Sequence, residues 1–178
     1  MLKILGIDPG SRVTGFGLIE CDANRVRYLD SGVIRLAEGD LPERLLQIYE
    51  GISAVIEQHR PTIAAIEKVF VSINPQSALK IGHARGSAIC ACAANKLTIS
   101  EYATREIKQS VTGIGSADKD QVRYMVQMLL QLEDIQTRDE SDALAVAIAH
   151  YQRMPMLDSI QDSHHRISPS EFVPPVTS

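Results

Sequence analysis

The sequence lacks the residues that mark several common classes of protein. Its three cysteines, Cys21, Cys90 and Cys92, have neither the spacing of a zinc site nor the even number of a disulfide framework. Such cysteine usage is typical of a reducing cytosol. No apolar run is long enough to cross a membrane, and the N-terminus has no basic stretch followed by a cleavable apolar segment. We therefore expect a cytoplasmic protein.

Aromatic residues and excess positive charge are also scarce. Tryptophan is absent and aromatic residues make up 4% of the 178 residues, which indicates an aliphatic, alanine-rich core. The formal net charge of −4 gives no overall attraction to nucleic acid, but a nucleic-acid footprint is local and is not excluded. The length suits one domain. We expect it at residues 1–153, followed by a flexible tail at 154–178 that has little apolar periodicity.

The order of apolar patterns predicts an α/β fold. Residues 4–7, 13–19 and 25–36 are expected to form three antiparallel strands, the first two joined by a turn at Pro9-Gly10-Ser11. Two further strands, at 62–67 and 97–102, alternate with helices. We therefore expect a mixed five-stranded sheet, antiparallel and then parallel, with helices on both faces. The helices are expected at 40–60, 75–95, 104–112, from Ser116 onward, and at 139–153.

Acidic side chains stand at the ends of two of these strands. Asp8 ends the first strand and Glu67 ends the fourth, so the two carboxylates are close if these strands are parallel neighbours. Asp139 and Asp142, three residues apart, can share one face of the last helix. Like charges about 4 Å apart repel by about 4 kcal/mol at an effective dielectric near 20, so such a cluster gains most from divalent cations. Carboxylates suit Mg²⁺ or Mn²⁺, and two such ions can promote phosphodiester cleavage.

Each of these acids also has an ordinary structural explanation. Asp8 could accept N–H groups of the turn as an Asx residue. Asp139 and Asp142 could form a capping box on the last helix. Glu67 could pair with a neighbouring cation such as Lys68. Glu140, which lies between the two aspartates, is expected to face solvent.

Cations outnumber acids between Val69 and Ala117, where Glu101 and Glu106 are the acids. Lys119 and Arg123 lie one helical turn apart, and a positive face beside an acidic metal site suits a phosphodiester substrate. Taken singly, each cation could be an ordinary solvated charge. Phe70, in the loop after Glu67, is either a core residue or an exposed one that stacks on bases or wedges between them. The cations between Val69 and Ala117 are Lys80, Arg85, Lys96, Arg105 and Lys108.

Five motifs together resemble those of the RuvC family of bacterial Holliday-junction resolvases. They arrive in the family's order between residues 2 and 150, which is far more specific than a lone Asp-x-Gly. The motifs are Ile4-Leu5-Gly6-Ile7-Asp8-Pro9-Gly10-Ser11-Arg12-Val13-Thr14-Gly15, Ile66-Glu67-Lys68-Val69-Phe70, Ser77-Ala78-Leu79-Lys80-x-Gly82-x-Ala84-Arg85-Gly86, Val111-x-Gly113-Ile114-Gly115-Ser116-Ala117-x-Lys119, and Asp139-x-x-Asp142-Ala143-Leu144-Ala145.

The resemblance implies a ribonuclease-H-like fold and a homodimer that resolves four-way DNA junctions. It implies paired, symmetric nicks in two strands of like polarity during recombination and repair, with two Mg²⁺ ions per site, for which Mn²⁺ can substitute. It also implies the branch-migration proteins RuvA and RuvB as partners. Some family members carry His where this chain has Asp139. The tail after Met154 departs from the family pattern and is not basic, so we assign it no DNA role.

The resemblance also implies roles for individual residues. The metal ligands would be Asp8, Glu67, Asp139 and Asp142. DNA contacts would come from Lys108 and Lys119, with Lys119 also in the catalytic set, and Phe70 would face the junction. We place Lys80 and Arg85 on the same DNA-binding face.

The helix expected at 75–95 carries Gly82 and Gly86 four residues apart. Because small residues permit close approach of a second helix, this helix is a candidate for the contact between two subunits. The alternative is that the two glycines let the helix lie flat on its own sheet.

Two other functional classes fit part of the pattern. Asp8-x-Gly10-Ser11 resembles the first phosphate loop of sugar kinases and actin-like ATPases, but that fold needs two such domains and a far longer chain. A non-catalytic junction-binding or scaffold protein would keep the basic face without needing four convergent acids. Mg²⁺-dependent nicking of a synthetic four-way junction separates these classes.

Overall fold

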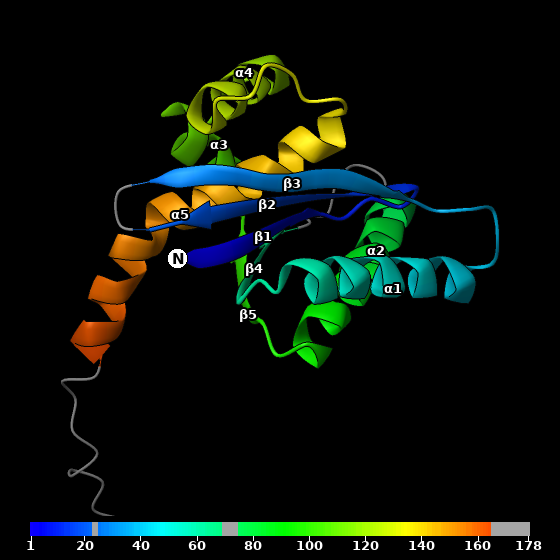
Figure 1. Ribbon diagram of the computed structural model, residues 1–178. Coiled ribbons are helices and arrows are strands. Elements are labelled where there is room, and N and C mark those ends of the chain that lie inside the picture. The colour runs from blue at the N-terminus through cyan, green and yellow to red at the C-terminus, as the bar shows by residue number, and fades with distance from the viewer. Residues whose placement is uncertain (23–24, 69–74, 165–178) are drawn as a thin grey trace, which may run out of the picture.

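The computed structural model contains a five-stranded sheet with helices on both faces (Figure 1). It describes residues 1–22, 25–68 and 75–164, with side chains as far as Met154. Within these ranges, no helix combines the length and the apolar character that a membrane span requires. The strands are β1 (Leu2–Asp8), β2 (Val13–Cys21), β3 (Val26–Arg35), β4 (Ile63–Glu67) and β5 (Thr98–Tyr102). The helices are α1 (Leu41–His59), α2 (Pro75–Ala94), α3 (Thr104–Thr112), α4 (Lys119–Leu130) and α5 (Arg138–His164).

The order of strands in the sheet is β3-β2-β1-β4-β5. β1, β2 and β3 pair antiparallel, whereas β1 pairs parallel with β4, which pairs parallel with β5. This confirms the predicted sheet. The central strand, β1, is therefore the place where the antiparallel and the parallel halves meet.

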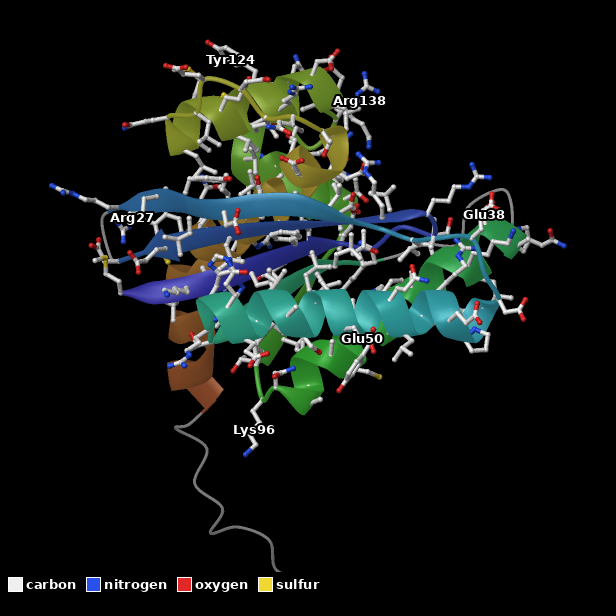
Figure 2. All side chains as sticks on the ribbon, turned by 45° about the vertical axis from the view of Figure 1, so that its right-hand side comes forward. Arg27, Glu38, Glu50, Lys96, Tyr124 and Arg138 are labelled. Atoms are coloured by element: carbon white, nitrogen blue, oxygen red, sulfur yellow. The ribbon has the colours of Figure 1, made fainter. Side chains whose placement is uncertain are left out.

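Alternating side chains of β1 supply two separate cores. Leu5 and Ile7 pack in one cluster with α1 and α2, and Ile4 packs in the other with α3, α4 and α5. Figure 1 shows the two sets of helices on opposite faces of the sheet. Polar side chains such as Glu50 on α1 project outward (Figure 2). Residues of β1 with even numbers, which include Asp8, thus belong to the face that α5 covers.

Two predicted helix boundaries were wrong. Helix α4 begins at Lys119 rather than at Ser116, because the Asp118 side chain accepts a hydrogen bond from the Gln121 backbone N–H at 2.8 Å and caps the helix there. Helix α5 does not end at Arg153 but continues to His164. The next ten residues include methionine, leucine and glutamine, which favour helices, but also Pro155, which disfavours a helix interior, so helix propensity does not predict this extension. The division into a domain at 1–153 and a separate tail stays a prediction.

Helix α5 lies directly on the backbones of β1 and β2. A Cβ atom added to Gly6 would stand 2.0 Å from the carbonyl oxygen of Ala143, and one added to Gly15 would stand 2.2 Å from that of Asp139. Gly17 meets the same helix one turn further on. Only glycine leaves room for such an approach. These glycines therefore place the first turn of α5 over the end of β1.

Candidate active site

Asp8 and Glu67 lie side by side at the ends of two parallel strands. In the register of β1 and β4, Ile7 stands opposite Ile66, and the two acids follow at the next position on each strand. Both acids belong to the sheet face covered by α5, since side chains alternate along a strand. The predicted meeting of these two carboxylates at one edge of the sheet is therefore confirmed.

Asp139 and Asp142 reach the same edge from the first turn of α5. Asp8 pairs with Gly15 in the antiparallel register of β1 and β2, and Gly15 lies against the backbone of Asp139. Lys119 Nζ at the start of α4 donates a 2.8 Å hydrogen bond to Asp142 Oδ2. The site is thus built by two strand ends and two helix N-termini.

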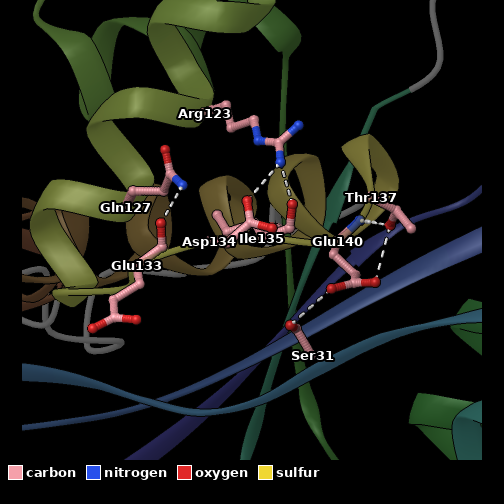
Figure 3. A network of polar contacts seen from close by, with 8 residues as sticks. All are labelled: Ser31, Arg123, Gln127, Glu133, Asp134, Ile135, Thr137 and Glu140. Atoms are coloured by element: carbon pink, nitrogen blue, oxygen red, sulfur yellow. Dashed lines mark hydrogen bonds and ion pairs between the residues drawn. The ribbon is translucent and has the colours of Figure 1, made fainter.

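The cap of α5 does not use either aspartate. The Glu140 backbone N–H donates to Thr137 Oγ1 at 3.2 Å, and the Thr137 hydroxyl donates to Glu140 Oε1 at 3.1 Å (Figure 3). Thr137 and Glu140 thus form a Thr-x-x-Glu capping pair at the N-terminus of α5. The capping explanation of Asp139 and Asp142 is therefore not supported, and their carboxylates stay available to the site.

The expectation that Glu140 faces solvent was wrong. Its residue is 8% exposed, and Oε2 accepts a 3.4 Å hydrogen bond from the Ser31 hydroxyl on β3. The spacing from Thr137 to Glu140 is that of a capping pair and could have predicted this role of Glu140. Asp139 and Asp142 have the same spacing, which favoured the wrong pair.

The charge of Asp8 is disfavoured in the folded protein. Burial is the main cause, followed by the negative charges of Glu67, Asp142 and Asp139, and together they raise the pKa of Asp8 to about 7. The ammonium of Lys119 acts in the opposite direction. Asp8 therefore lies within electrostatic range of each of the other three predicted acids.

A hydroxyl and a cation each stabilise one of these carboxylates. The Thr104 hydroxyl at the start of α3 donates to Glu67 Oε1. Burial raises the pKa of Glu67, and this hydrogen bond opposes the rise. The hydrogen bond to Asp142 is the main cause that raises the pKa of Lys119, so this side chain stays a cation. Sequence reasoning missed Thr104, although it comes two residues after the end of β5 and must therefore lie near the same edge of the sheet as Glu67.

A small cavity of about 60 Å³ opens between these groups. Its polar lining includes two acids, two cations and one hydroxyl: Glu67, Asp142, Lys108, Lys119 and Thr104. Among the described residues, no three acidic, histidine or cysteine side chains are close enough to enclose a metal ion together. The donor set nevertheless fits a hard divalent cation, since it consists of carboxylate oxygens whose mutual repulsion a cation relieves.

The remaining predicted DNA-binding residues lie elsewhere or have other partners. Arg85 Nε donates to the backbone carbonyl of Glu67 at 3.2 Å, and its guanidinium pairs with Glu101, so it braces the end of β4. Lys80 lines a separate hollow of about 450 Å³ between α1 and α2 that shares no lining residue with the acidic cavity. Phe70 lies outside the described residues. DNA contacts by these residues stay predictions.

A sheet of this topology, with acids at the ends of β1 and β4 and on the helix that crosses them, defines the class of ribonuclease-H-like nucleases. A sequence profile described as "Crossover junction endodeoxyribonuclease RuvC" matches residues 4–150. The chain therefore belongs to the RuvC family of crossover junction endodeoxyribonucleases.

Relatives and solved structures agree with this assignment. The crossover junction endodeoxyribonuclease RuvC of Legionella pneumophila (strain Corby) is 54% identical over 151 residues, which cover 84% of this chain and 87% of the relative. That of Alkalilimnicola ehrlichii is 50% identical over 156 residues, 88% of this chain and 94% of the relative. The structure of T. thermophilus RuvC in complex with Holliday junction substrate matches with a TM-score of 0.82 and 28% identity, over 88% of this chain and 96% of that one.

The fold extends to a more distant resolvase. The yeast mitochondrial Holliday junction resolvase Ydc2 matches with a TM-score of 0.66 at 10% identity, over 93% of this chain and 86% of that one. At this identity the likeness concerns the fold alone.

Proposed function

We propose that this chain resolves four-way DNA junctions by symmetric, paired nicks in two strands of like polarity, in recombination and repair. Membership of the RuvC family supports a junction-resolving endonuclease. The observation that carries the proposal is the convergence of four acids, three of which raise the pKa of the fourth, beside the cations Lys108 and Lys119. A scaffold protein would not need such a costly cluster.

The metal is part of the same proposal. Asp8, Glu67, Asp139 and Asp142 would hold Mg²⁺, two ions per site, with Mn²⁺ able to substitute. Bound divalent ions supply an activated water and stabilise the leaving oxygen. The chain's own residues prepare for them: Thr104 fixes one oxygen of Glu67, and Lys119 holds Asp142. Lys108 stands where it can meet a phosphate beside the acids.

The test is nicking of a synthetic four-way junction, compared with a linear duplex of the same sequence. We expect paired nicks in the junction with Mg²⁺ and none with a chelator, and little cleavage of the duplex. Tight junction binding without any cleavage would instead support a non-catalytic binding protein. Hydrolysis of ATP in place of DNA cleavage would support the kinase-like alternative.

Lys119→Ala should lose cleavage and weaken junction binding. The substitution removes the donor to Asp142 and a proposed phosphate contact, so the slope of log affinity against log salt concentration should fall by about 0.9. Binding at several salt concentrations without divalent metal measures this slope. The control is Lys96→Ala, since Lys96 projects at the opposite side of the molecule from α4 (Figure 2). An unchanged slope with full cleavage would make Lys119 an ordinary surface charge.

We further propose that two copies act together, with α2 in the contact between them. A junction offers two equivalent strands, and a two-fold dimer would place one site on each. Cβ atoms added to Gly82 and Gly86 would meet nothing within 4 Å. These glycines are therefore not needed for packing on their own sheet, which favours an intersubunit role. RuvA and RuvB remain partners proposed from the family.

Gly86→Leu should give a folded protein that sediments as a monomer, because its side chain enters open space in one chain but blocks close helix approach. Ala54→Leu, at an exposed position of α1, is the matched control and should stay dimeric. The accessibility of the Cys90 thiol gives a second measurement of the contact. Cys90 is the exposed one of the three free cysteines and lies one turn beyond Gly86. Tight dimerisation of Gly86→Leu would contradict the proposed contact.

A further inference from the structure

Glu140 stands on the opposite side of α5 from the acidic site. Residues two positions apart on a helix project about 200° apart, so Glu140 faces away from Asp142. Its carboxylate is buried and lies between two hydroxyls, those of Ser31 on β3 and Thr137 at the helix start (Figure 3). The Tyr28 hydroxyl lies 3.2 Å from that of Ser31 and extends this chain of hydrogen bonds into the sheet.

The segment that leads into α5 is held as well. Arg123 on α4 donates to Asp134 Oδ1 at 3.1 Å and to the backbone carbonyl of Ile135. Gln127 Nε2 donates to the backbone carbonyl of Glu133 at 3.4 Å (Figure 3). Helix α4, which carries Lys119 at its start, thereby fixes the entry into the helix that carries Asp139 and Asp142.

We infer that Glu140, through Ser31 and Thr137, is a positioning residue that sets Asp139 and Asp142 toward Asp8. The inference rests on the proposed metal-dependent function. On the sheet side, Gly15 allows the backbone of Asp139 to touch β2, but glycine alone does not fix the rotation of a helix about its axis. The contact between Glu140 and Ser31, on the edge strand β3, is a second attachment point for α5 and fixes this rotation.

The positions of Asp139 and Asp142 explain why a positioning residue is needed. Both are in the first turn of α5, where backbone N–H groups lack partners within the helix and the turn frays most easily. Fraying would move both carboxylates at once. Repulsion from Asp8 and Glu67 adds to this tendency while no cation is bound. The buried carboxylate of Glu140 is satisfied by the hydroxyls of Ser31 and Thr137, as a buried polar group requires, and these two contacts are what hold the turn in place.

The test is the affinity of the full chain for Mn²⁺, measured by electron paramagnetic resonance, alongside junction cleavage. Glu140→Ala should bind Mn²⁺ at least about tenfold more weakly, as is usual when a residue that supports a metal ligand is lost. Ser31→Ala should change the affinity in the same direction by less. Glu140→Gln keeps the shape without the charge and can still bond both hydroxyls, accepting from one through its oxygen and donating to the other through its NH2 group, so it should bind nearly as tightly as wild type.

Two controls separate positioning from charge and from stability. Glu133→Ala removes an exposed acid of the same segment and should leave the Mn²⁺ affinity unchanged. Ile56→Ala weakens the core on the other face of the sheet and should lower the melting temperature without weakening Mn²⁺ binding. If Glu140→Gln binds as weakly as Glu140→Ala, charge and not position is responsible and the inference fails.

The inference and the proposed function can fail separately. Wild type that neither binds Mn²⁺ nor cleaves would overturn the proposed function, and the inference with it. Wild type that binds and cleaves, with Glu140→Ala and Ser31→Ala equal to it, would overturn the inference alone. Should Glu140→Ala not fold, Ser31→Ala still decides, because it removes one hydroxyl from the contact.

Discussion

Gly15→Ala is expected to abolish junction cleavage and to lower the free energy of unfolding by about 3 kcal/mol. The added methyl would stand 2.2 Å from the carbonyl oxygen of Asp139, which is backbone and cannot rotate aside. Helix α5 must therefore shift, and Asp139 and Asp142 shift with it. Thermal melts should show a fall of about 6–12 °C for a chain of this size.

Gly82→Ala is the matched control for the stability of a single subunit, measured at a concentration below that at which subunits associate, because Gly82 belongs to the proposed contact between copies. It adds the same methyl to a glycine that has nothing within 4 Å of the new atom. Because alanine favours helix over glycine by about 1 kcal/mol, the control should be neutral or slightly stabilising. A Gly15→Ala protein that melts and cleaves like wild type would mean that α5 does not rest on β2 as described.

Asp8→Asn should melt higher than wild type when metal is absent, although it can no longer nick junctions. Burial and three carboxylates raise the pKa of Asp8 from 3.8 to about 7, so ionised Asp8 costs the fold on the order of 4 kcal/mol at pH 8. Asparagine keeps the shape and removes the charge. We expect it to recover about 1–3 kcal/mol, because its amide is still a buried polar group.

The pH dependence has a definite sign. Between pH 3.8 and about 7 the folded protein holds a proton on Asp8 that the unfolded chain releases, so this stabilisation is lost as the pH rises through that interval. The advantage of Asp8→Asn should therefore be largest at pH 8 and smaller at pH 5.5. Melts of both proteins at these two pH values measure the difference.

Mg²⁺ completes this test. It should raise the melting temperature of wild type, because it binds the folded state, and that of Asp8→Asn much less. Asp120→Asn, an exposed acid 4.0 Å from Arg138, should behave like wild type throughout. A metal-free Asp8→Asn protein that is less stable than wild type, yet gains as much from Mg²⁺, would show that Asp8 is a structural residue.

Residues whose roles depend on local pattern could be predicted from the sequence. The strand that ends at Asp8 and the strand that ends at Glu67 follow from apolar runs, and their parallel pairing brings both acids to one edge. The end of α3 at Gly113 follows from a glycine that adopts φ 78°. Such features need only the neighbouring residues and general rules of sheet geometry.

Residues whose roles depend on distant partners could not be predicted in the same way. Gly15 reads as an ordinary strand glycine until the helix that crosses it is known. From the sequence, Arg85 would be interpreted as a free cation. In the structure its guanidinium donates to the backbone carbonyl of Glu67 and pairs with the side chain of Glu101. Glu140 reads as solvated because its partner Ser31 lies on an edge strand far away in the chain.

The docking of α5 on β1 and β2 also fixes when the nuclease site can exist. Gly6 and Ala143 come from opposite ends of the chain, so their contact forms late in synthesis, which begins at the N-terminus. A nascent chain that stops before Arg138 contains Asp8 and Glu67 but neither of the other two acids. With the proposed set of four acids, cutting activity is therefore expected only after α5 has left the ribosome and folded back across β1 and β2.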